Sequence, residues 1–240
     1  MTIAVFVVAE AARDARVVQS LIKRVGDAKI GPEVQVDLVG PSTGYDPCFV
    51  AWKYLPKVMK DHGVKARHGH FGKQPKAADG GAAANALLVA RSWLKQGSNS
   101  ADLVVLQRDI DKQPERADGL AQARAEVLLP SPTKLAIGVA KPKVEAWAIC
   151  AIEVGANEAL QRSLENLRRD LGFDPRLESH QLEASDITAR RSAKRVLEAL
   201  LGSGDEAYEP LCETTPVEVL EARGKTNGLT ALLAELAAAI

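Results

Sequence analysis

Acidic side chains follow two of the most apolar segments of the sequence. Glu10 comes directly after the run IAVFVVA (3–9), and Asp109 and Asp111 come after the segment ADLVVLQR (101–108). Segments of this kind are typical of strands buried on both faces of a parallel sheet, and parallel strands place their carboxyl ends at one edge. We therefore expect the three carboxylates to lie close together at that edge.

Three carboxylates a few ångströms apart repel one another, which raises their pKa unless a cation neutralises them. Ligands that are all oxygen atoms favour a hard divalent ion such as Mg²⁺ or Mn²⁺. The pattern therefore predicts a metal site with Glu10, Asp109 and Asp111 as ligands. The alternative for each acid taken singly is a solvated residue in the loop that follows a strand.

A second group of residues suited to chemistry is basic. Between positions 52 and 76 the sequence has seven Lys and Arg residues against one acidic residue, Asp61, with Trp52, Tyr54 and Phe71 among them. Cationic side chains contact phosphates and aromatic rings stack on bases, so this segment is predicted to bind nucleic acid. The predicted contacts are Lys53, Lys57, Lys60, Lys65, Arg67, Lys73 and Lys76. The alternative is a basic face that meets only solvent.

The elements that would position these residues alternate between strand and helix. Apolar, β-branched runs predict strands at 3–9, 34–39, 101–106 and 134–140, and apolar residues at helical spacing predict helices at 11–25, 83–94 and 119–128. This alternation predicts right-handed βαβ crossovers and an α/β fold with a mostly parallel sheet flanked by helices.

The character of the sequence changes after Glu145. From there the period is helical throughout, at 145–171, 186–201, 215–222 and 228–239. We therefore expect two parts, an α/β core at 1–150 and a C-terminal helical extension at 151–240 that packs on the core.

The charge balance excludes one class of protein and indicates an uneven surface. The 240 residues carry 31 basic and 31 acidic side chains, so the chain is not of the strongly cationic kind that binds nucleic acid through its overall charge. Residues 1–150 nevertheless contain 21 basic and 15 acidic side chains, and residues 151–240 contain 10 and 16. The first part is thus net positive and the helical extension is net negative and acidic.

Cysteine content and hydropathy indicate the compartment. Cys48, Cys150 and Cys212 are an odd number and form no CxxC pair, which favours a reducing environment over a disulfide framework. The apolar run at the N-terminus is far shorter than the ~20 residues of a membrane span, and no basic segment precedes it. The sequence therefore predicts a soluble cytoplasmic protein without membrane contact.

Three motifs in order carry a resemblance to a known family. A glutamate after the first strand, the DxD pair after a later ADLVVL strand, and LAIGVAKPKVEAW (135–147) at the start of a helix resemble the Toprim domain. The last motif is similar to the EAW signature of the small stand-alone, OLD-nuclease-related Toprim-like proteins of bacterial defence loci. The resemblance spans most of the chain and implies a Toprim/Rossmann-like fold. In that family the glutamate is typically followed by glycine, whereas Ala11 follows Glu10 here.

The resemblance implies a metal-dependent nuclease that acts on DNA or RNA, in defence against phage and other foreign DNA. Glu10, Asp109 and Asp111 would bind Mg²⁺ or Mn²⁺, and the ion would polarise the phosphodiester and lower the pKa of an attacking water. Glu145 is expected as a fourth catalytic acid, either as a ligand of a second ion or as a general base. The alternative for Glu145 is a residue at the start of a helix, where the helix dipole favours an acidic side chain.

The resemblance also implies a partner, because small Toprim-like proteins are commonly paired with ABC-type or AAA-type ATPases. This sequence has no nucleotide-binding loop of its own: the segment GKT (224–226) lacks the first glycine of a P-loop, with Val219 in its place. The acidic extension is a candidate docking surface, and its last helix carries Leu229, Leu232, Leu233, Leu236 and Ile240 on one stripe. The alternative is that this stripe packs on the protein's own core.

Two other functions fit the same residues. The first is a Toprim-like binding or regulatory module whose catalytic site has degenerated, which Ala11 favours. The second is a glycosyltransferase in which the DxD pair holds Mn²⁺ and a nucleotide sugar. The intact DxD pair favours the nuclease over the binding module, and Glu10 favours it over the transferase.

Overall fold

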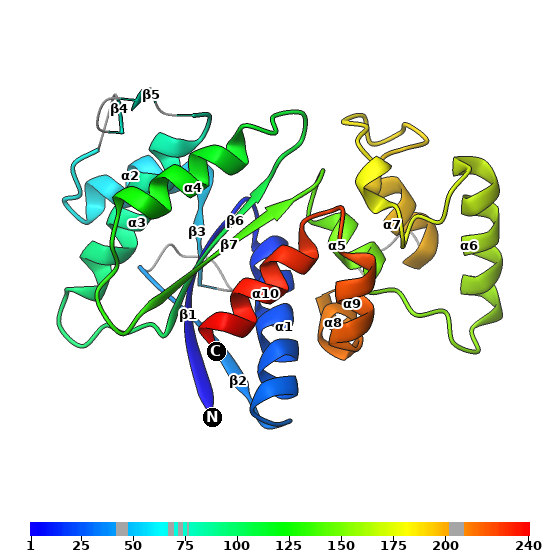
Figure 1. The fold of residues 1–240 in the computed structure, drawn as a ribbon, viewed down its shortest axis with the longest axis horizontal. Helices are drawn as coiled ribbons and strands as arrows, with labels where there is room; N and C mark the ends of the chain where they lie inside the picture. The colour runs from blue at the N-terminus through cyan, green and yellow to red at the C-terminus, as the bar shows by residue number, and fades with distance from the viewer. Residues whose placement is uncertain (42–47, 67–69, 72–73, 76, 202–208) are drawn as a thin grey trace.

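Figure 1 shows the chain in a computed structural model, which describes residues 1–41, 48–66, 70–71, 74–75, 77–201 and 209–240. The strands are β1 (Thr2–Ala9), β2 (Gln35–Val39), β3 (Val50–Ala51), β4 (His70–Phe71), β5 (Gln74–Pro75), β6 (Leu103–Asp109) and β7 (Lys134–Ala140). The α-helices are α1 (Ala12–Lys29), α2 (Leu55–Asp61), α3 (Gly80–Leu94), α4 (Arg116–Glu126), α5 (Glu145–Cys150), α6 (Glu158–Leu171), α7 (Ala193–Leu201), α8 (Glu209–Thr214), α9 (Val217–Arg223) and α10 (Leu229–Ala239). Two short 3-10 helices are η1 (Trp52–Tyr54) and η2 (Ser179–Gln181).

The main sheet is parallel, with the strand order β2-β1-β6-β7, and β3 pairs with the end of β1. Val8 of β1 lies beside Leu106 of β6, and Asp109 of β6 lies beside Ala140 of β7, so the carboxyl ends of these strands meet at one edge. Strands β4 and β5 form a separate antiparallel pair. The prediction of an α/β fold with a mostly parallel sheet flanked by helices is confirmed, and the architecture is Rossmann-like.

Alternate residues of the central strands enter two different cores, which explains why their sequences are continuously apolar. Val5 of β1 and Val105 of β6 pack on the side of α1, whereas Phe6 and Val104 pack on the side of α2, α3 and α4. Because side chains alternate along a strand, every position must be apolar when helices cover both faces. The same alternation decides which way the polar residues at the strand ends point.

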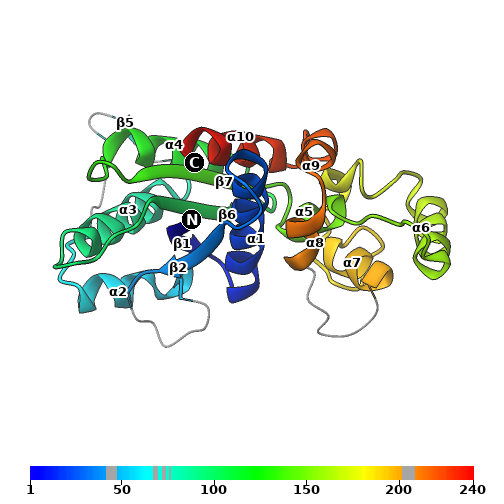
Figure 2. The same cartoon turned by 90° about the horizontal axis from the view of Figure 1, so that it is seen from below.

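The sheet is the middle of three layers, as the two perpendicular views show (Figures 1 and 2). Helices α1 and α10 share one core with the sheet, and α2, α3 and α4 form the other core on its opposite face. Helices α5 to α9 lie beside the sheet, and α6 is the outermost of them (Figure 2).

Helix α10 returns to the sheet after these helices and covers β7. The leucines of its apolar stripe, among them Leu232 and Leu236, are buried. The carboxylate of Glu235 accepts a hydrogen bond from the amide of Ile137 in β7 at 2.6 Å. Gly138 of β7 gives α10 room, since a Cβ there would lie 3.1 Å from Leu232. The stripe is part of the protein's own core, and a partner ATPase would have to dock on another surface.

The helical period at 145–171 does not form one helix. Residues 151–157 separate α5 from α6, and Gly155 within them has a positive φ of 51°. Asn157 then starts α6, because its side-chain oxygen accepts a hydrogen bond from the amide of Leu160 at 3.1 Å. A glycine and an N-cap residue therefore override the apolar period at this point.

The segment 186–192, predicted to be helical, forms turns. The Asp186 carboxylate accepts hydrogen bonds of 2.8 Å from both the amide and the hydroxyl of Thr188, which compete with a helix. The short elements β3, α2 and α8 and the β4–β5 pair were not predicted, because each is too short to show a period. Within the described residues, no helix has the length and apolar character needed to cross a membrane.

Candidate functional site

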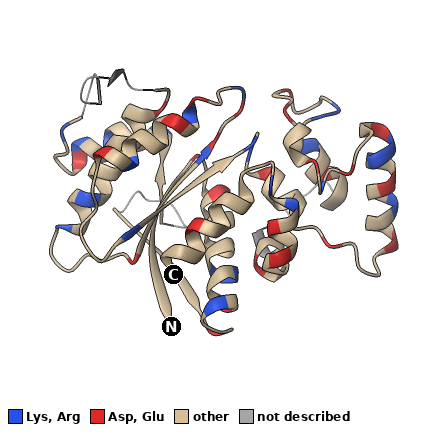
Figure 3. Ribbon diagram, viewed as in Figure 1, with Lys and Arg blue, Asp and Glu red and all other residues tan. Residues whose placement is uncertain are grey.

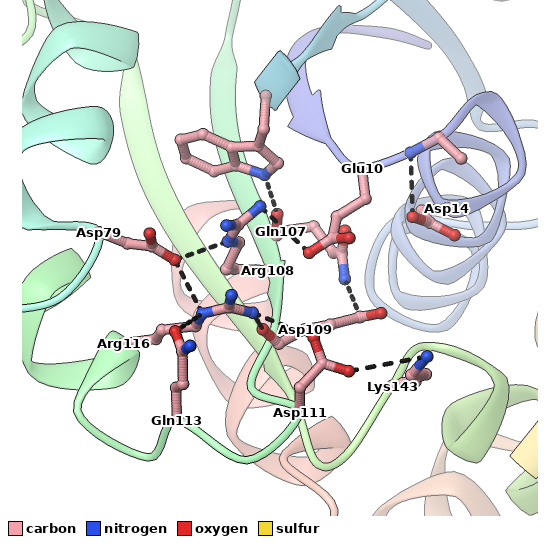
Figure 4. Close-up of polar contacts among 12 residues, drawn as sticks. Glu10, Asp14, Asp79, Gln107, Arg108, Asp109, Asp111, Gln113, Arg116 and Lys143 are labelled. Atoms are coloured by element: carbon pink, nitrogen blue, oxygen red, sulfur yellow. Dashed lines mark hydrogen bonds and ion pairs between the residues drawn. The ribbon is translucent and has the colours of Figure 1, made fainter. Parts of the chain in front are cut away.

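Strand alternation sends neighbouring residues at the carboxyl edge to opposite sides of the sheet. In β6, Gln107 and Asp109 share the face of α1, whereas Arg108 points to the face of α3 and α4. Glu10, one residue beyond β1, lies on the side of Arg108, and the two form an ion pair of 3.1 Å between Oε1 and Nη1. The edge therefore carries two adjoining groups of side chains, one acidic and one basic (Figure 4).

The acidic group consists of four carboxylates, which we call the acidic cluster: Glu10, Asp14, Asp109 and Glu145. Asp14 lies in the first turn of α1 and accepts a hydrogen bond from the amide of Ala11 at 3.1 Å. Burial, together with the carboxylates of Glu145 and Glu10, raises the pKa of Asp14 to about 7. Burial and the three other carboxylates of the cluster raise the pKa of Asp109 to about 8. At neutral pH the cluster therefore retains protons unless a cation takes their place.

Asp109 is held by two hydrogen bonds to one of its oxygens. Its Oδ1 accepts from the side-chain amide of Gln107 at 2.9 Å and from the backbone amide of Val144 at 3.1 Å. Gln107 is fully buried, and its carbonyl Oε1 has no hydrogen-bond partner among the described residues. Such an oxygen costs roughly 1–3 kcal/mol, so a cation or a hydrogen-bond donor beside it would be stabilising.

The chemistry of these groups suits a hard divalent ion, because carboxylate and amide oxygens are its preferred ligands. In the described part of the chain, however, no three His, Cys, Asp or Glu side chains form a metal-holding group as they stand. Two of the predicted ligands are instead held in ion pairs, Glu10 with Arg108 and Asp111 with Arg116. Glu10 could contribute to an ion site only after it leaves Arg108.

Asp111, predicted as a metal ligand, lies with the basic group. Its carboxylate is 3.2 Å from Nη1 of Arg116 and 3.7 Å from Nζ of Lys143. The chain turns sharply here, because Asp111 has a positive φ of 49° and its amide donates to the carbonyl of Pro142 at 3.0 Å. The two acids of the DxD pair thus have different surroundings, and Asp111 is not among the carboxylates that raise the pKa of Asp109.

The basic group is built on Arg108 and Arg116, which we call the arginine pair. One oxygen of Asp79 joins them, at 2.7 Å from Nε of Arg108 and 3.1 Å from Nε of Arg116. Arg116 also donates to the backbone carbonyl of Asp109 at 2.7 Å, and the guanidinium of Arg108 lies 5.3 Å from the ring centre of Trp52. Both side chains are less than a fifth exposed, so their guanidiniums are fixed at the edge.

The turn that presents Asp79 is pressed against α4. Gly119 of α4 lies so close to this turn that a Cβ on it would be 1.9 Å from a backbone carbonyl oxygen of the turn. Asp79 itself has a positive φ of 60°, and it and Asp111 are the two non-glycine residues with positive φ in the described part of the chain. Such conformations cost roughly 1–3 kcal/mol each and cluster at functional sites. Their occurrence in one network marks this edge as the candidate site.

Four residues of the site are not indicated by the sequence patterns: Asp14, Asp79, Arg108 and Arg116. Asp14 lies in the first turn of α1, where acidic side chains are common in any helix, so nothing in the local sequence assigns it to the site. Arg108 stands beside Asp109 in the sequence. Asp79 and Arg116 reach the site only through the tertiary fold, so no local pattern points to them.

The residues predicted to bind nucleic acid are partly described. Lys53, Lys57, Lys60 and Lys65 are exposed, whereas Arg67, Lys73 and Lys76 lie outside the described residues. Lys57 pairs with Asp61 at 2.8 Å, and the ammonium of Lys53 lies 4.8 Å from the ring centre of Tyr54. The four described lysines therefore remain accessible to a ligand on η1, α2 and the turn that follows.

The fold and the site define a Rossmann-like α/β protein with an acidic cluster and an arginine pair at the carboxyl edge of its sheet. No family model matches the chain, and the searches of curated proteins and of solved structures found no match. The resemblance to Toprim domains remains a hypothesis that rests on the motifs. Ala11, where that family has glycine, has φ −142° and ψ 166°, a conformation open to any residue, so alanine fits the backbone here.

Proposed function

We propose that this chain is a divalent-metal-dependent nuclease with a Toprim-like site. The observation that carries the proposal is the buried carboxylate of Asp109, which has three further carboxylates around it and two fixed guanidiniums beside it. Clustered carboxylates suit Mg²⁺ or Mn²⁺, and guanidiniums suit the oxygens of a phosphate. Hydrolysis of a phosphodiester needs both kinds of group in one place.

Three residues would hold the ion. Asp109 and Asp14 are already buried together, and Glu10 would exchange Arg108 for the ion when substrate arrives. Once bound, the ion supplies Lewis-acid activation of the phosphate and of an attacking water. When Glu10 leaves Arg108 for the ion, Arg108 becomes free to contact the substrate. Binding of the ion would therefore increase the affinity for phosphate, and binding of phosphate would increase the affinity for the ion.

The remaining residues act on the substrate. Arg108 and Arg116 contact the phosphate oxygens, and Asp79 keeps both guanidiniums at the edge. Glu145 is close enough to raise the pKa of Asp14 and of Asp109, and in this position it serves as the base for the attacking water.

Cleavage of labelled oligonucleotides tests the proposal. The wild type is expected to cleave in Mn²⁺ or Mg²⁺ and not in EDTA, and Asp109→Asn is expected to cleave nothing. Asp170→Asn removes an exposed carboxylate from α6 and is the matched control, with full activity expected. If neither ion supports cleavage of single-stranded or double-stranded DNA or RNA, the proposal is wrong.

Asp79→Asn is expected to weaken phosphate binding without affecting the acidic cluster. Asparagine tolerates a positive φ, but it removes the charge that holds both guanidiniums. The affinity for a labelled oligonucleotide in EDTA, measured by fluorescence anisotropy, should fall roughly threefold to tenfold, about 1 kcal/mol. Stabilisation by Mn²⁺ should remain that of the wild type. An unchanged affinity would show that the arginine pair does not contact phosphate.

One observation favours a second candidate, a binding module without catalysis. The arginine pair is complete, whereas Glu10 is occupied by Arg108 and the described residues form no metal-holding group. Such a module would bind oligonucleotides in the assay above and cleave none of them. Transfer of a nucleotide sugar through the DxD pair has no comparable support, because Asp109 and Asp111 face different partners.

A further inference from the structure

A basic groove between helix α3 and the segment that follows α2 lies apart from the site described above. It has a volume of about 440 Å³ and is lined by Gly63, Val64, Lys65, Ala66, Leu88, Arg91, Ser92 and Lys95. Leu88 is buried and gives the groove an apolar floor, Lys65 and Lys95 are exposed, and Arg91 is half-buried. None of the described residues that line it is acidic, so three cations make it suited to an anion.

The basic character extends beyond the groove. Lys57 and Lys60 are exposed on α2, and the acid among them, Asp61, is already paired with Lys57 at 2.8 Å. Helix α3 contains no acidic residue. Figure 3 shows basic segments on α2 and at the end of α3, whereas acidic and basic segments alternate on α6. A small anion needs only one pocket, so cations on α2 in addition to those at the end of α3 favour a chain of phosphates.

Helix α3 connects the groove to the candidate site. It begins directly after Asp79 and ends at Leu94, beside Lys95 of the groove. Its 15 residues span ~22 Å at ~1.5 Å per residue. Phosphates of one DNA strand are ~3.4 Å apart along the helix axis, so about seven nucleotides cover this distance.

We propose that the groove formed by Lys65, Arg91 and Lys95 binds the phosphate backbone of a nucleic acid about seven helical nucleotides from the arginine pair. The substrate class in this inference rests on the proposed function. The groove adds a second contact to the arginine pair, and two contacts on one strand bind far more tightly than either alone, because the second is intramolecular.

The test is binding of a fluorescein-labelled single strand of about 20 nucleotides in EDTA, where no metal-dependent step contributes. For Lys65→Ala/Arg91→Ala/Lys95→Ala the affinity should fall at least about tenfold near 100 mM salt. The slope of log affinity against log salt should become shallower by about 2, since each lost contact with a single strand removes ~0.7. The matched control, Arg169→Ala/Arg190→Ala/Lys194→Ala, removes three exposed cations from the α6–α7 region and should bind as the wild type does.

Strand length separates an extended path from a pocket for a small anion. A dinucleotide cannot reach both places even when it is fully extended, so the groove variant should weaken its binding by no more than about twofold. An equal loss for the short and the long strand would overturn the extended path, and an unchanged long-strand affinity would overturn the groove. If the variant loses affinity but the wild type never cleaves, the groove stands and the nuclease fails. If the wild type cleaves but the groove variant binds the long strand as tightly as the wild type, the nuclease stands and the groove fails.

Discussion

Asp109→Asn is expected to make the metal-free protein more stable than the wild type at alkaline pH and to abolish its stabilisation by Mn²⁺. In the folded wild type the pKa of Asp109 is about 8 and that of Asp14 about 7, against an ordinary value of 3.8. The folded state therefore keeps protons that the unfolded chain releases. The stability that these two groups contribute is complete below about pH 4 and is lost as the pH rises through 7 and 8.

Asparagine removes one charge from the acidic cluster and keeps the hydrogen bonds. Its Oδ1 can still accept from the amides of Gln107 and Val144. At about pH 9 the free energy of unfolding should exceed that of the wild type by several kcal/mol, because each unit by which folding raises the pKa of Asp109 corresponds to ~1.4 kcal/mol. Below about pH 4 the two proteins should be equally stable.

A bound ion offsets the same repulsion, so it should stabilise the wild type. Mn²⁺ at about one hundred times its Kd adds ~2.7 kcal/mol, and the effect should be larger near pH 8 than near pH 6, because protons compete with the ion. Thermal melting at several pH values, with and without Mn²⁺, measures the pH dependence of stability and the stabilisation by the ion. Asp170→Asn is the control. Identical pH profiles for the wild type and Asp109→Asn would contradict the buried acidic cluster, and identical shifts with Mn²⁺ would contradict the ion site.

Gly119→Ala is expected to destabilise the protein and to disorganise the arginine pair, although position 119 has no polar side chain in the site. A Cβ there would lie 1.9 Å from the carbonyl oxygen of Ala78 and 2.6 Å from the amide nitrogen of Gly80. Both are backbone atoms of the turn that presents Asp79, so the turn or α4 must move. Overpacking of this kind typically costs about 1–3 kcal/mol, and the contact with two backbone atoms places this case at or above the upper end.

Gly26→Ala is the matched comparison, because Gly26 also lies within a helix. A Cβ there meets the side-chain methyl Cγ1 of Val34 at 2.9 Å, and a side chain can shift where backbone cannot. Alanine favours a helix over glycine by ~1 kcal/mol, which offsets that contact. Urea unfolding should therefore separate the two variants by several kcal/mol, and Gly119→Ala alone should lose oligonucleotide affinity in EDTA. Equal unfolding midpoints would show that the turn is not fixed by α4.

The position of the site at the carboxyl edge could be predicted from the sequence. Strands β1, β6 and β7 are apolar at nearly every position because helices cover both faces of the sheet, and this makes them visible as continuous runs, whereas β2 shows an alternation of polar and apolar residues. The positions of Glu10 and Asp109 at this edge follow from the ends of β1 and β6. The place of Asp14 does not follow from the sequence, because an acidic residue in the first turn of a helix is common whether or not it belongs to a site.

The basic half of the site could not be predicted, for a physical reason. Asp79 and Arg116 are brought together by the close approach of α4 to one turn, which depends on the missing side chain of Gly119. A glycine inside a helix gives no sign in the sequence of what it packs against. The separation of Asp111 from Asp109 likewise depends on a single positive φ, and DxD as a motif does not reveal it.

The return of α10 to β7 has a consequence for synthesis on the ribosome. Strand β7 is synthesised about ninety residues before α10, the helix that covers it. The chain between them leaves the sheet after β7 and returns to the same place, where the backbone amide of Lys141 and the indole of Trp147 both donate to the carbonyl of Asn227. Until α10 has emerged, the nascent chain exposes the apolar part of the β7 face that α10 covers in the folded protein. Contacts so distant in sequence form slowly, and exposed strand surface promotes aggregation. A stalled chain that ends before Leu229 is therefore a natural substrate for chaperones and proteases.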